Sequence, residues 1–457
     1  MAQERQQVSG LSLDLYHLDA AYVSWRSGQN GLATFDIYTR TAPFAGAYMV
    51  TAGLQPALDF VREFVFSGED LAYLRAVKGY DAGFLDELRD YRFSGDIDAI
   101  AEGIISFPDE PMLRVTAPFR HALLLESGLL RAVGISTLIA TKAARLVEAA
   151  QGRPIADFGY RRAQDPYLAT RSAIIGGCAS TSYVAGAARF NVPTAGTIPH
   201  ALVQSFPSEE DAFRAVAATL PSYSLLLDTY DVRHAIETAV RVAQEAQAQH
   251  GHTLAAVRLD SGDLDADSRY VREVLDRGGL RETRVLVSDN LNEFRIADLL
   301  AAGAPIDGFG VGGNLDVGLG AIESGTVGGT LGAVFKLVWY EGDGDPARIK
   351  VAGDKSTWPG RKQVARVGDF REDVIQLEDE PIPADATPLL HPVMRGGAQI
   401  TPEPDVLALR DVAAAQLAAL PAPHRRLRDA APYPVRKSPA LLALREQATR
   451  REEAVRP

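Results

Sequence analysis

The sequence predicts an α/β protein whose central part is a β/α barrel. Between about residues 150 and 340, short apolar runs alternate with amphipathic segments of helical periodicity, a pattern typical of parallel sheets. Polar side chains follow the ends of these runs, where β/α barrels place their active sites. The units recur often enough to favour a closed or nearly closed barrel over an open sheet.

Length and composition indicate a globular protein of more than one domain. The chain has 457 residues, of which 46% are hydrophobic and 23% charged, enough for two or three domains with full cores. The polar N-terminus and the charges that interrupt the apolar stretch 122–140 lead us to expect neither a signal peptide nor a membrane span. The single cysteine, Cys178, excludes an internal disulfide and favours a cytoplasmic location; we interpret it as a packed residue.

The net charge of −12 argues against nucleic-acid and membrane-surface partners. An acidic protein that binds an anionic ligand must gather its cations locally. The sequence shows such gathering at Arg161 and Arg162 and in the basic stretch 348–366, which includes Lys355.

The expected elements follow in chain order. Residues 1–125 form an α/β region with strands at 34–39 and 47–51 and an amphipathic segment at 54–65. In the barrel, apolar runs lie at 225–227, 254–259, 285–287 and 306–311. Helical segments are expected through 236–242 with a stop at Gly251, at 268–276 and at 292–302. The C-terminal part, from about 402, is helical.

The second of these runs ends in the densest polar group, Arg258, Asp260, Ser261 and Asp263. Helix capping would explain a lone Asp228 or Ser288, but not these residues together. The group therefore predicts an active site. Asp260 and Asp263 would help to hold Mg²⁺ brought in by a phosphorylated substrate. Because no HExxH or CxxC pattern is present, we expect no dedicated structural metal site.

A basic pair, a Gly/Ser/Thr turn and a histidine lie between residues 157 and 200. The guanidinium forks of Arg161 and Arg162 suit a carboxylate or a phosphate. The turn contains Thr181 and Ser182, and His200 follows a Gly-Thr-Ile-Pro segment. A histidine in this place suits acid/base chemistry or acceptance of a phosphoryl group. The run predicts an anionic phosphorylated substrate.

Two glycine-rich segments follow later in the chain. The segment 308–313 formally matches a dinucleotide fingerprint but lacks an acidic residue about twenty positions on. We interpret it, with Gly312 and Gly313, as a phosphate loop after a late strand, although glycines that serve only the turn would show the same pattern. A second flexible loop is expected at 325–330.

Several motifs in this order resemble those of nicotinate phosphoribosyltransferases over nearly the whole chain. They are residues 13–16, 35–40, 52–54, 158–163, 196–200, 228–230, 258–263, 335–337 and the basic run 350–366. The resemblance implies an irregular β/α barrel and an α/β sandwich domain formed from N-terminal and C-terminal segments. The expected parts are the N-terminal part of the sandwich at 1–135, the barrel at 136–340, a return to the sandwich at 341–400 and a C-terminal helical segment at 401–457.

The resemblance also implies an activity. Nicotinate and 5-phosphoribosyl 1-pyrophosphate would give nicotinate mononucleotide and pyrophosphate, a step of NAD biosynthesis that requires Mg²⁺ and is coupled to ATP hydrolysis. In the family, ATP phosphorylates the histidine at the position of His200. The family is commonly dimeric, so we expect a homodimer in which residues of the N-terminal motif reach a neighbouring subunit's site.

The site residues expected from these motifs fall into two groups. The catalytic group is His200, Arg258 and Asp260. Tyr16 would stack on the pyridine ring. The remaining expected substrate contacts are Arg161, Arg162, Thr181, Ser182, Asp263, Ser288, Gly312, Gly313 and Lys336.

Three positions depart from the family pattern: Leu13 and Gly313, where threonine is usual, and Tyr183, where asparagine is usual. The last two lie near the expected phosphate contacts and leave open a catalytically silent homologue that acts as a binding protein. Two rival enzyme classes are a phosphoribosyltransferase for nicotinamide or quinolinate, and an aldolase-like lyase with Lys336 as its Schiff-base lysine. Because nicotinamide needs no carboxylate clamp, the arginine pair favours the acid.

Overall fold

The computed structural model describes residues 8–320, 328–342, 344–351 and 356–455. The chain divides into two compact units, a terminal unit of residues 1–141 and 330–457 and a central unit of residues 142–329. Half of the expected loop at 325–330, and Lys355, lie outside the described residues. Among the described helices, none combines the length and apolar character needed to cross a membrane.

The central unit is built on one parallel sheet with the strand order β10-β11-β12-β13-β8-β9. Its strands are β8 (Ile155–Asp157), β9 (Ser180–Thr181), β10 (Ser222–Leu226), β11 (Thr253–Leu259), β12 (Arg284–Val287) and β13 (Gly308–Val311). Because these strands run in the same direction, their carboxyl ends meet at one edge of the sheet. We call this edge the strand-end edge.

This sheet forms a half-barrel, which confirms the predicted α/β class with an irregular barrel. The expectation of a closed or nearly closed barrel is wrong, because the two outer strands of the described sheet do not pair with each other. β9 and β10 are its outer strands. The chain between them forms the helices α8 (Val184–Phe190), α9 (His200–Gln204) and α10 (Glu209–Thr219), so it adds no further strand to the sheet. The irregularity has a local cause: the chain between β9 and β10 is interrupted by Pro193, Pro199 and Pro207, and its longer periodic stretches are helical.

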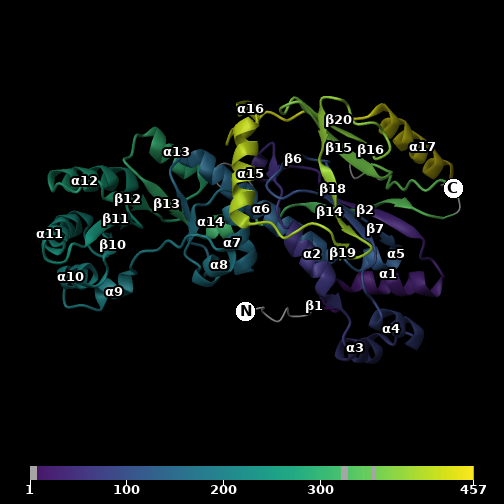
Figure 1. Ribbon diagram of the computed structural model, residues 1–457, viewed down its shortest axis with the longest axis horizontal. Coiled ribbons are helices and arrows are strands. Elements are labelled where there is room, and N and C mark those ends of the chain that lie inside the picture. The colour runs from purple at the N-terminus through teal and green to yellow at the C-terminus, as the bar shows by residue number, and fades with distance from the viewer. Residues whose placement is uncertain (1–7, 321–327, 343, 352–355, 456–457) are drawn as a thin grey trace. The chain divides into compact units, whose positions relative to one another are not determined.

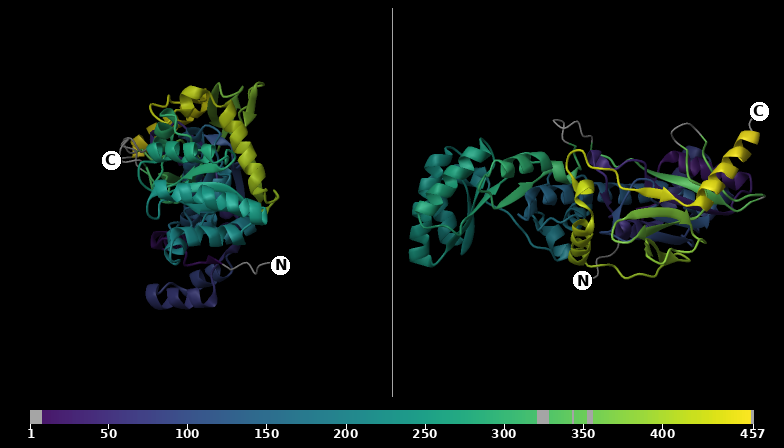
Figure 2. Two further views of the ribbon diagram at one scale, coloured as in Figure 1. Left: turned by 90° about the vertical axis from the view of Figure 1, so that its left-hand side faces the viewer. Right: turned by 90° about the horizontal axis from the view of Figure 1, so that it is seen from above.

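Helices connect the strands of the central unit. They are α7 (Pro166–Ile175), α11 (Val232–His250), α12 (Leu264–Arg277), α13 (Glu293–Ala301) and the short α14 (Gly313–Asp316). Asp231, Asp263 and Asn292 accept hydrogen bonds from the first turns of α11, α12 and α13 and so fix where each helix begins. Helices α10, α11 and α12 lie side by side along one face of the sheet (Figure 1, Figure 2). This arrangement leaves the strand-end edge to loops.

The terminal unit combines the two ends of the chain, which confirms the predicted sandwich of N-terminal and C-terminal segments. Its larger sheet has the order β14-β2-β7-β5-β18-β19, in which β14 pairs with β2 and β18 with β5. The strands are β2 (Leu32–Thr39), β5 (Asp96–Ile100), β7 (Leu113–Pro118), β14 (Ala333–Tyr340), β18 (Leu390–Arg395) and β19 (Ala398–Gln399). A buried apolar core that includes Phe35 and Phe335, stacked 4.6 Å apart, joins the two segments.

The remaining elements of the terminal unit complete it. A second sheet, of order β17-β15-β16-β20, contains β15 (Lys362–Val367), β16 (Glu372–Leu377), β17 (Ala386–Pro388) and β20 (Val435–Lys437). Two short pairs are β1 (Val8–Ser9) with β4 (Phe64–Val65) and β3 (Met49–Val50) with β6 (Ile105–Ser106). The helices are α1 (Leu15–Arg26), α2 (Leu54–Glu63), α3 (Gly68–Lys78), α4 (Ala82–Arg89), α5 (Phe119–Leu123), α15 (Val406–Ala419), α16 (Ala422–Arg425) and α17 (Pro439–Val455). Helix α6 (Glu126–Ala150) continues from this unit into the central one.

A buried ion pair anchors the smaller sheet. The Arg366 guanidinium donates from Nε to Asp373 Oδ1 at 3.0 Å and from Nη2 to Oδ2 at 2.6 Å. Tyr433 donates its hydroxyl to the same carboxylate at 3.0 Å. Burial and the Asp373 charge raise the pKa of Glu110 well above its ordinary value. Arg366 is therefore the cation that stabilises a buried acidic group.

We expect Arg366→Met to lower the free energy of unfolding by about 3–5 kcal/mol, because it leaves the Asp373 carboxylate buried without its guanidinium partner. Denaturant-induced unfolding measures this change. Arg371→Met is the matched control, since the Arg371–Asp385 pair is 63% and 58% exposed and should cost no more than about 1 kcal/mol. Equal effects of the two variants would contradict the assigned role of Arg366.

Candidate active site

Two cavities lie at the strand-end edge of the central unit and share Phe158, Arg161 and Asp260. The histidine cavity, of about 380 Å³, is lined by Phe158, Tyr160, Arg161, Ser182, Gly196, Thr197, Ile198, Pro199, His200, Arg258 and Asp260. The loop cavity, of about 160 Å³, is lined by Phe158, Arg161, Arg162, Asp260, Ser288, Asp289, Asn290, Leu291, Gly310, Gly312, Gly313 and Asn314. The loops that follow five different strands thus contribute to one site.

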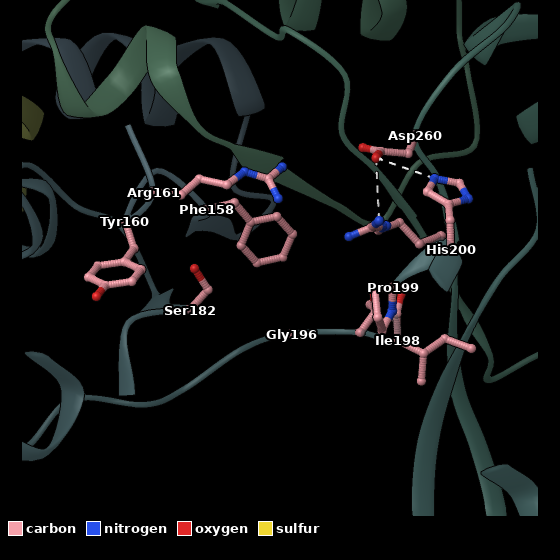
Figure 3. A pocket seen from close by; sticks show the side chains of 11 residues that line it. Phe158, Tyr160, Arg161, Ser182, Gly196, Ile198, Pro199, His200 and Asp260 are labelled. Carbon is pink, nitrogen blue, oxygen red and sulfur yellow. Dashed lines mark hydrogen bonds and ion pairs between the residues drawn. The ribbon is translucent and has the colours of Figure 1, made fainter. Parts of the chain in front are cut away.

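Asp260, just after β11, connects the polar groups of the site. Its Oδ2 lies 3.4 Å from Arg258 Nη2 and 3.9 Å from His200 Nε2. Figure 3 shows the Asp260 carboxylate directed toward His200. Its Oδ1 accepts a hydrogen bond from the Ser288 hydroxyl, which follows the neighbouring strand β12. The predicted residues Arg258, His200 and Ser288 are therefore brought together around Asp260.

His200 begins the short helix α9 and presents two different ring nitrogens. Nδ1 lies 3.1 Å from the Thr229 hydroxyl, at hydrogen-bond distance. Nε2 faces Asp260, and the side chain is 39% exposed. Since one nitrogen is held by Thr229, the ring orientation is fixed and Nε2 is left for chemistry in the cavity.

Arg161 and Arg162 follow β8 and are both exposed. Arg161 lines both cavities and Arg162 lines the loop cavity. Within the described residues, no carboxylate forms an ion pair with either guanidinium. In a chain of net charge −12, two adjacent cations without a counter-ion in the described part of the protein have the charge and geometry that suit an anionic ligand.

The loop cavity has backbone features that suit a phosphate. Gly312 and Gly313 follow β13 and begin α14. The Asn314 side chain donates to the carbonyl oxygens of Asn290 at 3.0 Å and Leu291 at 2.9 Å, which ties the turn after β13 to the turn after β12. Asn290 has a φ of 42°, in the left-handed region, as tight ligand-binding turns often require.

The two residues of the predicted Gly/Ser/Thr turn have different surroundings. Ser182 lines the histidine cavity, as expected for a substrate contact. Thr181 is fully buried, and its hydroxyl donates to Asp157 at 2.8 Å and accepts from the Tyr183 backbone N–H at 3.0 Å. The structure therefore places Thr181 beneath the site, where it supports the turn.

Three other predicted residues do not line these cavities. Asp263 is exposed, and its carboxylate caps α12 by accepting from the Ala266 N–H at 3.2 Å. Tyr16 and Lys336 belong to the terminal unit. Tyr16 is 57% exposed, and its partial desolvation together with the Glu126 and Asp14 charges raises its pKa to about 12.

Cys178 is fully buried, just before β9. Burial and the nearby Asp157 and Asp316 carboxyl groups raise the pKa of its thiol well above the ordinary value. Both observations agree with a packed residue and argue against a thiolate nucleophile.

The sequence analysis gave no site role to three motif residues that the structure places in or beside the cavities. Phe158 lines both of them. Thr229 orients His200, and Asp228 accepts from the Asp260 backbone N–H at 3.1 Å and from the Ser261 hydroxyl. Phe158 directly follows β8, and Asp228 and Thr229 lie two and three residues after the end of β10. A position just beyond a strand is the sequence signal that would have identified them.

Comparisons with known proteins identify the family. Residues 11–134 match the nicotinate phosphoribosyltransferase N-terminal domain, and residues 378–445 match its C-terminal domain. A nicotinate phosphoribosyltransferase of Mycobacterium tuberculosis is 40% identical over 443 residues, which cover 94% of this chain and 92% of that protein. One of Bacillus subtilis is 38% identical over 385 residues, with coverages of 81% and 77%. The chain belongs to the nicotinate phosphoribosyltransferase family.

Solved structures agree with membership of the nicotinate phosphoribosyltransferase family. Human nicotinic acid phosphoribosyltransferase matches with a TM-score of 0.84 at 29% identity, covering 95% of this chain and 99% of the human one. A nicotinate-nucleotide pyrophosphorylase from Pyrococcus furiosus has a TM-score of 0.73 at 23% identity and shows that its fold is shared.

The two departures near the site have structural explanations in this nicotinate phosphoribosyltransferase family member. At Gly313, a Cβ atom would lie 2.7 Å from Arg162 Cδ, so the absence of a side chain makes room for the arginine. Tyr183 stacks on Tyr160, which lines the histidine cavity, with ring centroids 4.3 Å apart and an angle of 10° between the planes. Gly313 itself lines the loop cavity, whereas Tyr183 is connected to the histidine cavity through its contact with Tyr160.

We expect Gly159→Ala to lower the free energy of unfolding by about 1–3 kcal/mol, because a Cβ atom would lie 2.2 Å from Asp316 Cγ in a buried region. The denaturant midpoint at constant m-value reports the change. Gly196→Ala is the control for stability, since nothing lies within 4 Å of its added Cβ, and its effect should stay within about 0.5 kcal/mol. An unchanged midpoint for Gly159→Ala would contradict the close packing of the loop on Asp316.

Proposed function

We propose that this protein is a nicotinate phosphoribosyltransferase that uses ATP through a phosphorylated His200. Nicotinate would attack C1 of 5-phosphoribosyl 1-pyrophosphate through its ring nitrogen, and the bond from C1 to the pyrophosphate oxygen would break with its electron pair leaving on pyrophosphate. The products are nicotinate mononucleotide and pyrophosphate, as in NAD biosynthesis. The observation that carries the proposal is the pair of exposed arginines, without an ion-pair partner among the described residues, beside the Asp260 cluster in a chain of this family.

The geometry suggests where the substrate's parts bind. Phe158 offers an aromatic wall for the pyridine ring, and Arg161 offers a fork for the nicotinate carboxylate. The 5-phosphate would bind in the loop cavity, against Ser288 and the Gly312-Gly313 turn. Because the two cavities share Phe158, Arg161 and Asp260, C1 of the ribose would lie near Asp260. Binding both anions in fixed positions is the main catalytic contribution that the reaction needs.

The residues present also fit Mg²⁺ that arrives with the substrate. Asp260 is partly exposed in the cavity, and Asp228 has a buried Oδ1 without a hydrogen-bond partner in the described part of the chain. Magnesium prefers oxygen ligands and usually takes one or two carboxylates together with substrate phosphates. Asp228 and Asp260 would hold it, and when bound it would neutralise charge that develops on pyrophosphate. Asp263 fits this role less well, since its carboxylate caps α12.

His200 is the proposed phosphoryl acceptor. Nε2 would attack the γ-phosphorus of ATP, the bond to the ADP oxygen would break, and ADP would leave. Water would later release phosphate from the histidine and restore it. Thr229 supports this role because its hydrogen bond to Nδ1 keeps Nε2 directed into the cavity. Arg258, 15% exposed beside Asp260, would balance phosphate charge.

Two further parts of the proposal concern assembly and location. We place Tyr16 at the site of a neighbouring subunit in a homodimer, where its exposed ring would cover the pyridine. Lys336, in the same unit as Tyr16, would add a cation to that contact. A cytoplasmic location suits the single buried thiol.

Pyrophosphate release tests the proposed reaction, with 5-phosphoribosyl 1-pyrophosphate, Mg²⁺ and nicotinate, nicotinamide or quinolinate, each with and without ATP. We expect turnover with nicotinate alone and a higher rate with ATP. Turnover only with another pyridine would keep the reaction class and overturn the carboxylate clamp. Release with none of them would favour a silent homologue or a lyase.

The same assay tests His200 separately. His200→Asn should lose the stimulation by ATP and keep about the ATP-free rate of the wild type, because it removes the acceptor nitrogen and leaves the arginines in place. His250→Asn, an exposed change at the end of α11, should keep the full stimulation. Retained stimulation in His200→Asn would contradict the proposed role.

A further inference from the structure

Two buried carboxyl groups, those of Asp157 and Asp316, lie together beneath the site. Asp157 ends β8 and is 0% exposed, and Asp316 ends α14 and is 3% exposed. Gly159 contacts both, since its N–H donates to Asp157 Oδ1 at 2.8 Å and a Cβ on it would lie 2.2 Å from Asp316 Cγ. Neither residue is used in the proposed reaction.

The two carboxyl groups differ in their hydrogen bonds. Asp157 accepts from the Gly159 N–H at 2.8 Å and, on Oδ2, from the hydroxyls of Thr170 at 3.1 Å and Thr181 at 2.8 Å. Such donors stabilise an ionised carboxylate. Both oxygens of Asp316 lack a hydrogen-bond donor among the described residues. An ionised Asp316 would therefore be a buried charge without a partner, whereas a neutral one has a hydroxyl that can donate to Asp157.

The surroundings favour the neutral form of Asp316. Burial, followed by the charge and the hydrogen-bonding capacity of Asp157, raises the pKa of Asp316 to about 9. Cys178, before β9, is the neighbouring thiol. The nearby cations are Arg162, whose side chain packs on Gly313, and Arg171, which is buried on α7, the helix packed against α14. Despite them, the direction of the pKa shift is upward.

The pair connects three segments that line the cavities. Asp157 directly precedes Phe158 and the arginine loop, and it holds Thr181, next to Ser182. Asp316 lies in the helix that starts from the Gly312-Gly313 turn, and its N–H donates to the Gly312 carbonyl at 3.2 Å. A hydrogen bond between the two side chains would thus join the proposed phosphate turn to the loops after β8 and β9.

We propose that Asp316 is a positioning residue whose neutral carboxyl group donates a hydrogen bond to the Asp157 carboxylate and so holds these three segments in the arrangement that binds the phosphoribosyl substrate. The identity of the substrate rests on the proposed function, whereas the proton shared by Asp157 and Asp316 does not. Loss of that proton places two negative charges together in a buried space, which loosens the three segments. Affinity for the phosphoribosyl substrate then falls as the pH rises past about 9.

The first test is the pH dependence of stability. The pKa of Asp316 is higher in the folded protein than the value of about 3.9 in an unfolded chain. Between these values the folded state holds a proton that the unfolded state has lost, so rising pH favours unfolding about tenfold per unit. Asparagine has no such proton and keeps an amide donor for Asp157. The ratio of the unfolding constants of wild type and Asp316→Asn should therefore rise with pH and level off above about 9.

Asp298→Asn is the matched control in this measurement. Asp298 is an exposed aspartate on α13 in the same unit, so this variant should follow the wild type at every pH. Parallel curves for wild type and Asp316→Asn from pH 6 to 10 would overturn the shared proton. This test uses no substrate, so its outcome is independent of the proposed function.

The second test separates positioning from stability. The KM of the wild type for 5-phosphoribosyl 1-pyrophosphate should rise about tenfold between pH 8 and 10, whereas that of Asp316→Asn should stay within about threefold of its own neutral value. Asp316→Leu, similar in size but without a donor, should show a raised KM at every pH. If Asp316→Leu does not fold, the pH profile of Asp316→Asn still tests the positioning role. Identical pH profiles for wild type and Asp316→Asn would overturn the positioning role, and an inactive wild type would instead overturn the proposed function.

Discussion

The parallel alignment of the central strands is the constraint on which the rest of the site depends. Because β8 to β13 run in one direction, loops that are far apart in sequence meet at one edge of the sheet. The arginine loop, the Ser182 turn, the Arg258–Asp260 pair, Ser288 and the Gly312-Gly313 turn come together only for this reason. An antiparallel sheet would divide them between two edges.

Carboxylates organise this edge in two layers. Asp260, in the cavity, contacts Arg258, His200 and Ser288 from three separate segments. Asp157, beneath it, accepts hydrogen bonds from Gly159, Thr170 and Thr181. These two carboxylates thus interact with cations and hydrogen-bond donors of the protein itself, whereas Arg161 and Arg162 remain exposed and can meet a ligand. This distribution explains how a chain of net charge −12 can present a local binding place for anions.

The sequence predicted the strands and much of the site because strand ends carry a local signal. The apolar runs at 254–259 and 285–287 match β11 and β12, and Asp260 and Ser288 meet directly after these two strands. Arg258, inside β11, and His200, at the start of α9, contact the same Asp260 carboxylate. It did not predict Asp316, which lies in the helix after β13 and acquires its importance only from the buried neighbour Asp157. Nor did it separate Thr181 from Ser182, since the direction of a side chain in a tight turn depends on the backbone around it. Glycine at position 313 leaves room for the Arg162 side chain, and this contact could not be predicted from the spacing of residues in the sequence.

A crystal structure of the protein with nicotinate mononucleotide tests the central claim most directly, because this product contains both the pyridine carboxylate and the 5-phosphate. We predict that the pyridine ring lies against Phe158, with its carboxylate at Arg161 and the phosphate at Ser288 and the Gly312-Gly313 turn. A nucleotide bound in another part of the molecule, or bound with its phosphate at Arg161 and its ring in the loop cavity, would contradict this placement.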